Sequence, residues 1–221
     1  MLKSRCSSQK GDIMEKEIIK KLKEEGSVEA IKTLMDFNGG YITSKQVTEL
    51  GIHRMYLNIM MKKGIIQKVK KGIYIDNNII EDIYYSFQLK YPKIIYSRFT
   101  ALYFYGLTEI FPHTFELTVD YNYHVDEIDK SCSVIKCKKQ ILELGVVKVK
   151  TQGGHYINCY DRERCICDII KYKNRLDIEQ VKKSVKMYVK DDNKNLSKLS
   201  KYAKIMNIYD DVMNFVGMYY E

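Results

Sequence analysis

Glycines divide the segment from residue 39 to residue 75, GGYITSKQVTELGIHRMYLNIMMKKGIIQKVKKGIYI, into short pieces. Gly51 follows the piece SKQVTEL, and Gly64 follows IHRMYLNIMMKK. The apolar residues of both pieces have helical spacing, and glycine is a common helix stop. Thr43 or Ser44 can cap the first helix. The sequence therefore predicts two short helices joined by a tight turn, which is the helix-turn-helix arrangement.

The flanking residues extend this prediction on both sides. Ile31, Leu34 and Met35 share one helical face, and Ser27 is a candidate cap for that helix. A turn and a short strand, GGYIT, come next. Downstream, IIQKVKKGIYI alternates around KKG, where Gly72 supplies the positive φ of a hairpin turn. A helix-turn-helix followed by a basic hairpin is a winged helix.

The positive charge of the chain is concentrated in this segment. The whole chain has a net charge of +9, and residues 41–75 carry seven basic residues and one acidic residue. A local excess of this kind indicates a surface that binds a polyanion. A solvated cationic face without a partner is the alternative.

A winged helix inserts the N-terminal end of its second helix into the major groove of DNA. Arginine can bond to guanine and asparagine to adenine, whereas lysines contact phosphates. The candidate base-reading residues are His53, Arg54, Tyr56 and Asn58; the candidate phosphate contacts are Lys62, Lys63, Lys68, Lys70 and Lys71. Ser44 and Lys45, at the start of the preceding helix, complete the candidate DNA-binding set. Tyr56 can equally pack against the hairpin, and Met55 is expected in the core or as a filler residue rather than in contact with a base.

The remaining residues, 81–221, predict a mixed α/β domain. Ser97 can cap the helix RFTALYFYG, FELTVDY has the pattern of a strand, and GVVKVKTQGGHYINCYD that of a hairpin. A helix starts at Asp161, and three further helices follow it to the end of the chain. The expected fold is α+β: a disordered arm over 1–13, a winged helix-turn-helix over 14–80, and a mixed domain over 81–221 that ends in a helical bundle.

The segment 39–75 resembles the N-terminal winged-helix domain of the AbiEi antitoxins, from the AbiE abortive-infection systems of bacteria. The similarity continues through YPKIIYSRFTALYFYGLTEIFPHTFELTVDYNY, YINCYDRERCICDIIKYKNRLDIEQVKKSVKMYV and NLSKLSKYAKIM. It covers roughly residues 27 to 216, and YDRERCICD is its most specific part. In that part the resemblance marks an antitoxin-domain signature of five residues: Tyr160, Asp161, Glu163, Arg164 and Asp168.

This resemblance implies a function in two parts. The N-terminal domain would bind inverted repeats in double-stranded operator DNA and repress its own operon. The C-terminal domain would neutralise a nucleotidyltransferase-like toxin without forming a stable complex, as in type IV toxin–antitoxin systems. The protein would be a monomer in solution or a dimer on DNA.

The signature also has the residue types of a metal-dependent nuclease, which needs clustered acids and a lysine. Each acid has a structural explanation, however: Asp161 as a helix cap, Glu163 near the helix dipole, and Asp168 as the partner of Arg164. No phosphate-binding loop, nucleophile elbow or histidine metal motif is present. We therefore expect no catalytic residues, no metal and no cofactor. The alternatives are a winged-helix regulator with a ligand-sensing C-terminal domain and, less favoured, a nuclease.

The apolar runs and the spacing of the cysteines indicate the cellular compartment in which the protein is expected. No apolar run of about 18 residues and no signal peptide occurs, so we expect no membrane association. None of the six cysteines forms a C-x-x-C pair. Free, mostly buried thiols in a reducing cytoplasm are the expectation.

Overall fold

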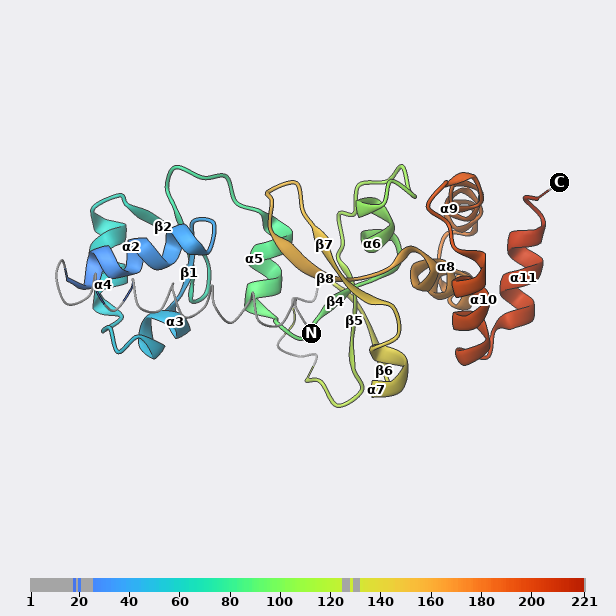
Figure 1. The fold of residues 1–221 in the computed structure, drawn as a ribbon, viewed down its shortest axis with the longest axis horizontal. Coiled ribbons are helices and arrows are strands. Elements are labelled where there is room, and N and C mark those ends of the chain that lie inside the picture. Colours follow the sequence, from blue (N-terminus) through green and yellow to red (C-terminus); the bar gives the residue numbers. More distant parts are fainter. Residues whose placement is uncertain (1–17, 19, 21–25, 125–127, 129–131, 221) are drawn as a thin grey trace. The chain divides into compact units, whose positions relative to one another are not determined.

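The computed structural model describes residues 18, 20, 26–124, 128 and 132–220. The expected arm over residues 1–13 lies outside them. The chain divides into two compact units, Met1–Lys90 and Tyr91–Glu221. Each unit combines helices with one sheet, so the α+β class is confirmed (Figure 1).

The first unit follows the order of elements expected from the glycine stops. Its elements are α2 (Ser27–Phe37), β1 (Tyr41–Thr43), α3 (Ser44–Glu49), α4 (Met55–Lys62), β2 (Ile66–Lys70), β3 (Ile73–Asp76) and α5 (Ile83–Lys90). The three strands form an antiparallel sheet in the order β1-β3-β2.

The ends of these helices have local causes. Thr43 begins α3 through a reciprocal capping box with Gln46, at 3.2 and 2.9 Å. Gly51 and Gly64 have φ of 72° and 68°, in the left-handed region that ends helices. Ser27 does not act as the expected cap. It is the first helical residue, and no side chain caps this end of α2.

Two apolar layers lie on opposite faces of this sheet. On one face, α2, α3 and α4 bury residues that include Ile31, Val47 and Leu57. On the other face, Tyr41 meets the ring of Tyr85 from α5 edge-on, with 5.0 Å between centroids. Because α5 covers this second face, the first unit extends to residue 90, ten residues beyond the boundary expected from the sequence.

A β-bulge changes the alternation expected for the hairpin. Lys68 lies opposite Tyr74, but Lys70 lies opposite its neighbour Ile73, so the register shifts between the two lysines. Residues directly opposite each other in a ladder share a face. Lys68 and Lys70 therefore point to opposite faces of the hairpin, whereas strict alternation would place them on the same face.

The second unit is built on a five-stranded mixed sheet in the order β6-β5-β4-β8-β7. Its strands are β4 (Ile95–Tyr96), β5 (Glu116–Asp120), β6 (Ser133–Cys137), β7 (Val146–Lys150) and β8 (Tyr156–Tyr160). Its helices are α6 (Arg98–Phe104), α7 (Lys139–Leu142), α8 (Arg162–Lys171), α9 (Ile178–Lys190), α10 (Leu196–Ile205) and α11 (Tyr209–Gly217), with a 3-10 turn over Lys173–Arg175. Helix α8 packs against α6, α9, α10 and α11 (Figure 1).

One cap in this unit differs from expectation. Ser97 occupies the N-cap position of α6, but its hydroxyl makes no capping bond. A carboxylate oxygen of Glu116 instead accepts the N–H of Phe99, at 2.7 Å. The cap is therefore supplied by β5, a strand far along the chain. No helix in the described part of the chain is long and apolar enough to cross a membrane.

Candidate nucleic-acid interface

Helix α4 presents a narrow exposed stripe. Met55, Asn58 and Lys62 are exposed, and their spacing of three and four residues places them within an arc of about 60°. Leu57 and Met60 occupy the opposite side and are buried in the core. Met55, expected in the core, is 50% exposed. The stripe therefore begins at the N-terminal end of the helix and faces away from the protein.

His53 and Arg54 shape the turn that leads into α4. Both side chains are exposed. His53 Nδ1 accepts the N–H of Met55 at 3.1 Å, which satisfies one of the unpaired donors at the helix start. Arg54 Nε donates to the hydroxyl of Thr48 at 2.9 Å, so α3 orients this guanidinium. Residues 52–54 therefore belong to the turn, and α4 starts at Met55.

Tyr56 has a different environment from its neighbours. It is half-buried and packs against the core cluster that includes Ile66 and Tyr74 of the hairpin strands. Packing against the hairpin was the alternative left open by the sequence, and the cluster that Tyr56 packs against contains residues of both α4 and the hairpin strands.

Four lysines surround the stripe with exposed charge. Lys62 and Lys63 end α4, and Lys68 and Lys71 belong to the hairpin strand and its turn. All four are exposed, and within the described residues none has a carboxylate at ion-pair distance. Their charges are therefore available to an anionic partner.

Lys45 and Lys70 differ because each has an acidic neighbour. Lys70 Nζ lies 3.8 Å from Glu81 Oε1, and its side chain is only 27% exposed. Lys45 Nζ lies 3.7 Å from Glu49 Oε1, with both side chains largely exposed. An exposed pair of this kind is weak. Lys45 is more readily released to an anion than Lys70.

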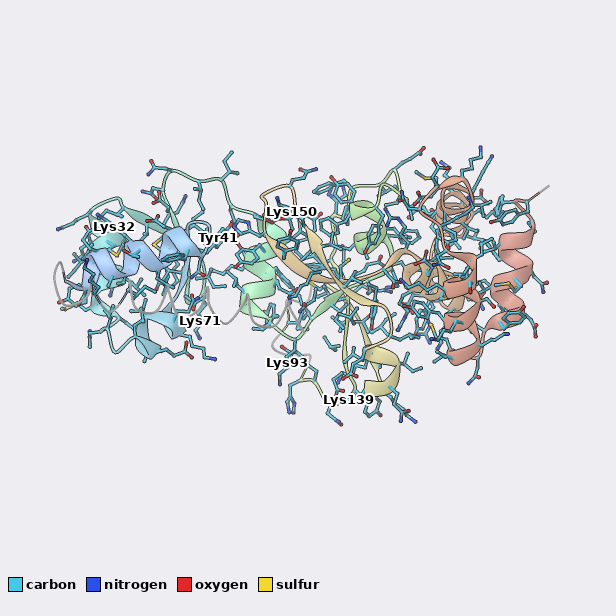
Figure 2. All side chains as sticks on the ribbon, viewed as in Figure 1. Lys32, Tyr41, Lys71, Lys93, Lys139 and Lys150 are labelled. Carbon is cyan, nitrogen blue, oxygen red and sulfur yellow. The ribbon has the colours of Figure 1, made fainter. Side chains whose placement is uncertain are left out.

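Ser44 holds the start of α3 against the hairpin turn. Its N–H and hydroxyl both donate to the carbonyl of Gly72, at 2.8 and 3.3 Å. This contact places Lys71 beside the N-terminus of α3 (Figure 2). The structure thus brings together cations from α4, the hairpin and α3, while Ser44 itself has a structural partner.

Residues 29–75 match the model of a protein family described as a transcriptional regulator, the AbiEi antitoxin. The AbiEi resemblance is confirmed over these residues. The matched span runs from α2 through β3. It contains the four exposed lysines of α4 and the hairpin, together with Lys45 and Lys70. No curated protein matches the chain. The match supports a role as an antitoxin and transcriptional regulator, and the AbiEi family is one of regulators.

The five residues that the sequence resemblance marks as a signature, in the second unit, lie in the interior of that unit. Asp161 caps α8 by accepting the N–H of Arg164 at 2.9 Å. Its other carboxylate oxygen accepts the hydroxyl of Tyr202 at 3.0 Å and the ammonium of Lys198 at 2.8 Å. Asp161 therefore joins the start of α8 to α10, and its lone pairs already have partners.

Glu163 makes a second connection from the same turn. One carboxylate oxygen accepts the hydroxyl of Tyr188 at 3.2 Å and the N–H of Asn195 at 3.0 Å. The side chain of Glu163 is almost fully buried. Burial and the adjacent Glu163 charge both raise the pKa of Tyr188, so its hydroxyl remains a proton donor. This bond joins α8 to α9.

Arg164 is the centre of the cluster. Its Nε donates to both carboxylate oxygens of Asp168, at 3.2 and 3.1 Å, and its guanidinium carbon lies 4.2 Å from the centroid of the Tyr160 ring. One terminal nitrogen donates to the carbonyls of Ile141 and Leu144. Burial raises the pKa of Asp168, and the Arg164 charge opposes that shift.

The cluster therefore has the geometry of an internal brace. Tyr160, Arg164 and Asp168 are almost fully buried. Within the described part of the chain, no three His, Cys, Asp or Glu side chains are placed to hold a metal ion. The nuclease alternative requires its carboxylates to face a substrate, whereas these carboxylates face Arg164, tyrosines and Lys198.

The described cysteines also lie mostly in the interior. Cys159, Cys165 and Cys167 are buried, and none of the five described cysteines forms a disulfide. Burial raises the pKa of the Cys165 thiol. A protonated, enclosed thiol is a poor nucleophile and a poor metal ligand.

A small open cavity lies elsewhere in the second unit. It has a volume of about 200 Å³ and is lined by residues 108–110 and by the first turns of α9. Sites for small-molecule ligands usually enclose roughly 300–1,000 Å³. The cavity gives little support to the ligand-sensing alternative.

Proposed function

We propose that the first unit is a winged helix-turn-helix that binds duplex operator DNA. Helices α3 and α4 are the helix-turn-helix, and β2 and β3 are the wing. The observation that carries the proposal is the group of four exposed lysines around the exposed stripe of α4, for which the described part of the chain holds no carboxylate at ion-pair distance. The AbiEi match over the same residues supports it.

The proposed contacts follow from the position of each side chain. Asn58 lies on the exposed stripe and reads adenine, and Arg54, oriented by Thr48, reads guanine. The lysines contact phosphates, which fix the position of the protein without specifying sequence. These are Lys62, Lys63, Lys68 and Lys71, with Lys45 as a secondary contact.

The other candidate residues contribute through structure. His53 caps the start of α4, and Tyr56 packs against the core of the first unit. Ser44 fixes the hairpin turn to α3. Lys70 contributes less than Lys71, because Glu81 offsets its charge.

We further propose that the protein represses its own operon from an inverted repeat, and that two copies meet on DNA. Its second unit neutralises a nucleotidyltransferase-like toxin without a stable complex. In that unit the signature residues Tyr160, Asp161, Glu163, Arg164 and Asp168 act as the brace that keeps β8, α8, α9 and α10 in place. They support the antitoxin surface and do not form it, since their polar atoms are paired internally.

Co-expression tests the antitoxin part. The neighbouring gene product is expressed alone, with the full-length protein, and with its Lys62→Ala/Lys71→Ala variant. We expect growth arrest in the first case and rescue in both others, because rescue belongs to the second unit. A harmless neighbour, or arrest that the full-length protein does not relieve, contradicts the antitoxin assignment. A ligand-sensing regulator would bind DNA and rescue nothing.

A further inference from the structure

The exposed side chain of Met55 is an unusual feature of the proposed recognition helix. It is the first residue of α4 and is 50% exposed, while the next two residues of the helix pack into the core. Single exposed apolar side chains are common on protein surfaces and need no explanation by themselves. Met55, however, shares its narrow stripe with Asn58 and Lys62, the proposed base-reading and phosphate-contacting residues.

The major groove offers one apolar group to such a side chain. Thymine carries a 5-methyl group there, and apolar protein side chains contact it. A methionine side chain is long and flexible and adapts to a small apolar target. Arginine and lysine cannot make this contact favourably, because burial of their charge beside a methyl group gains nothing.

The helix geometry restricts where that thymine lies. Met55 and Asn58 are three residues apart, which corresponds to a rise of about 4.5 Å along α4. Successive base pairs are about 3.4 Å apart. The base pairs that the two side chains contact are therefore at most two steps apart. The tilt of the helix in the groove decides whether they are the same pair, adjacent pairs or pairs separated by one other.

We propose that Met55 is a specificity-determining residue that reads the 5-methyl group of a thymine, in the same base pair as the adenine bound by Asn58 or within two base pairs of it. This inference rests on the proposed operator binding. The half-site thus contains an A·T-rich step at the N-terminal end of α4. Loss of the methyl group removes an apolar contact and leaves every base-pairing hydrogen bond unchanged.

The experiment uses DNA that differs only in that methyl group. The duplex immediately upstream of the coding sequence is amplified once with dTTP and once with dUTP, so that uracil replaces every thymine made in the reaction. Affinity of the full-length protein, its Met55→Ala variant and its Met55→Leu variant is measured for both duplexes at one salt concentration. Lys63→Ala is the matched control from the same helix.

The wild-type protein is expected to bind the uracil duplex roughly fourfold more weakly for each half-site, the value of one buried methyl group. Met55→Ala is expected to bind both duplexes equally, and Met55→Leu to retain discrimination. Lys63→Ala is expected to weaken both duplexes and keep their ratio. For each variant, the affinity for the thymine duplex is divided by the affinity for the uracil duplex. Comparison of these ratios between variants removes any general effect of uracil on DNA shape.

Two results overturn the inference while operator binding stands: equal wild-type affinity for the two duplexes, or full discrimination by Met55→Ala. If the wild-type protein binds neither duplex, the proposed function itself fails. Met55 is half-exposed and touches neither described core cluster, so its variants are expected to fold.

Discussion

The N–H and the hydroxyl of Ser44 both donate to the carbonyl of Gly72, a residue 28 positions further along the chain. Gly72 has a φ of 77°, and a Cβ at this position would lie 2.7 Å from the Ser44 hydroxyl oxygen. The close approach therefore requires glycine. It fixes the tip of the proposed wing against the first helix of the helix-turn-helix.

Gly72→Ala is expected to destabilise the protein by about 2–3 kcal/mol, from the left-handed backbone and the clash together. Gly51→Ala is the control, because Gly51 has a similar φ of 72° but open space around its Cβ. It should cost only about 1 kcal/mol. Urea unfolding measures both, and removal of the clash in Gly72→Ala/Ser44→Ala should recover part of the difference. Equal losses at positions 51 and 72 would refute the close contact.

The two neighbouring lysines of the hairpin should behave differently. Lys71→Ala is expected to weaken binding to all DNA sequences alike and to reduce the salt slope by about 1, because one phosphate contact is lost. Lys70→Ala should change the slope less, since Glu81 lies 3.8 Å from the Lys70 ammonium. Affinity measured over a range of salt concentrations separates the two. A larger effect at position 70 would contradict the smaller contribution that we assign to Lys70.

Arg54 should affect sequence preference. Arg54→Ala is expected to cost about 1–3 kcal/mol on the operator and to relax preference at one base pair. Lys62→Ala, from the same helix, is the control and should preserve preference while it lowers affinity. Competition between operator and mutated operator duplexes measures both properties. If the two variants lose the same share of preference, the division into base and phosphate contacts is wrong.

The buried brace of the second unit should dominate its stability. Arg164→Met leaves the Asp168 carboxylate buried without its partner and is expected to cost about 3–5 kcal/mol. Arg162→Met is the matched control, because Arg162 pairs with Asp191 at 3.0 Å where it is partly exposed. That change should cost about 1 kcal/mol or less. Denaturant unfolding of the full chain measures both variants, and similar losses would argue against the proposed brace.

Local sequence signals predicted much of the first unit. The stops at Gly51 and Gly64, the Thr43 cap and the hairpin around Gly72 each depend on a few adjacent residues. The helical spacing of Met55, Asn58 and Lys62 also places these three residues on one face, which is the exposed stripe. Methionine is more often a core residue than a surface residue, so the residue type at position 55 predicts burial instead.

Features that depend on distant contacts could not be predicted in this way. The bulge between Lys68 and Lys70 places Lys70 opposite Ile73, whose side chain belongs to the cluster that α5 covers. The start of α6 is capped by Glu116 in a strand, so the adjacent Ser97 was a misleading signal. Within the signature, the Asp161 cap and the Arg164–Asp168 pair followed from spacing. The bonds from Arg164 to α7 and from Asp161 to α10 did not, because those helices are distant in sequence.

The salt dependence of binding to the upstream control region shows whether the exposed lysines of the first unit bind duplex DNA. The proposed function predicts that log K falls linearly with log salt with a slope of about −4 to −5, for about five phosphates neutralised by the four exposed lysines and Lys45. It also predicts tighter binding to this duplex than to an unrelated duplex of equal length. Absence of binding at low ionic strength, or a slope near zero, would contradict it.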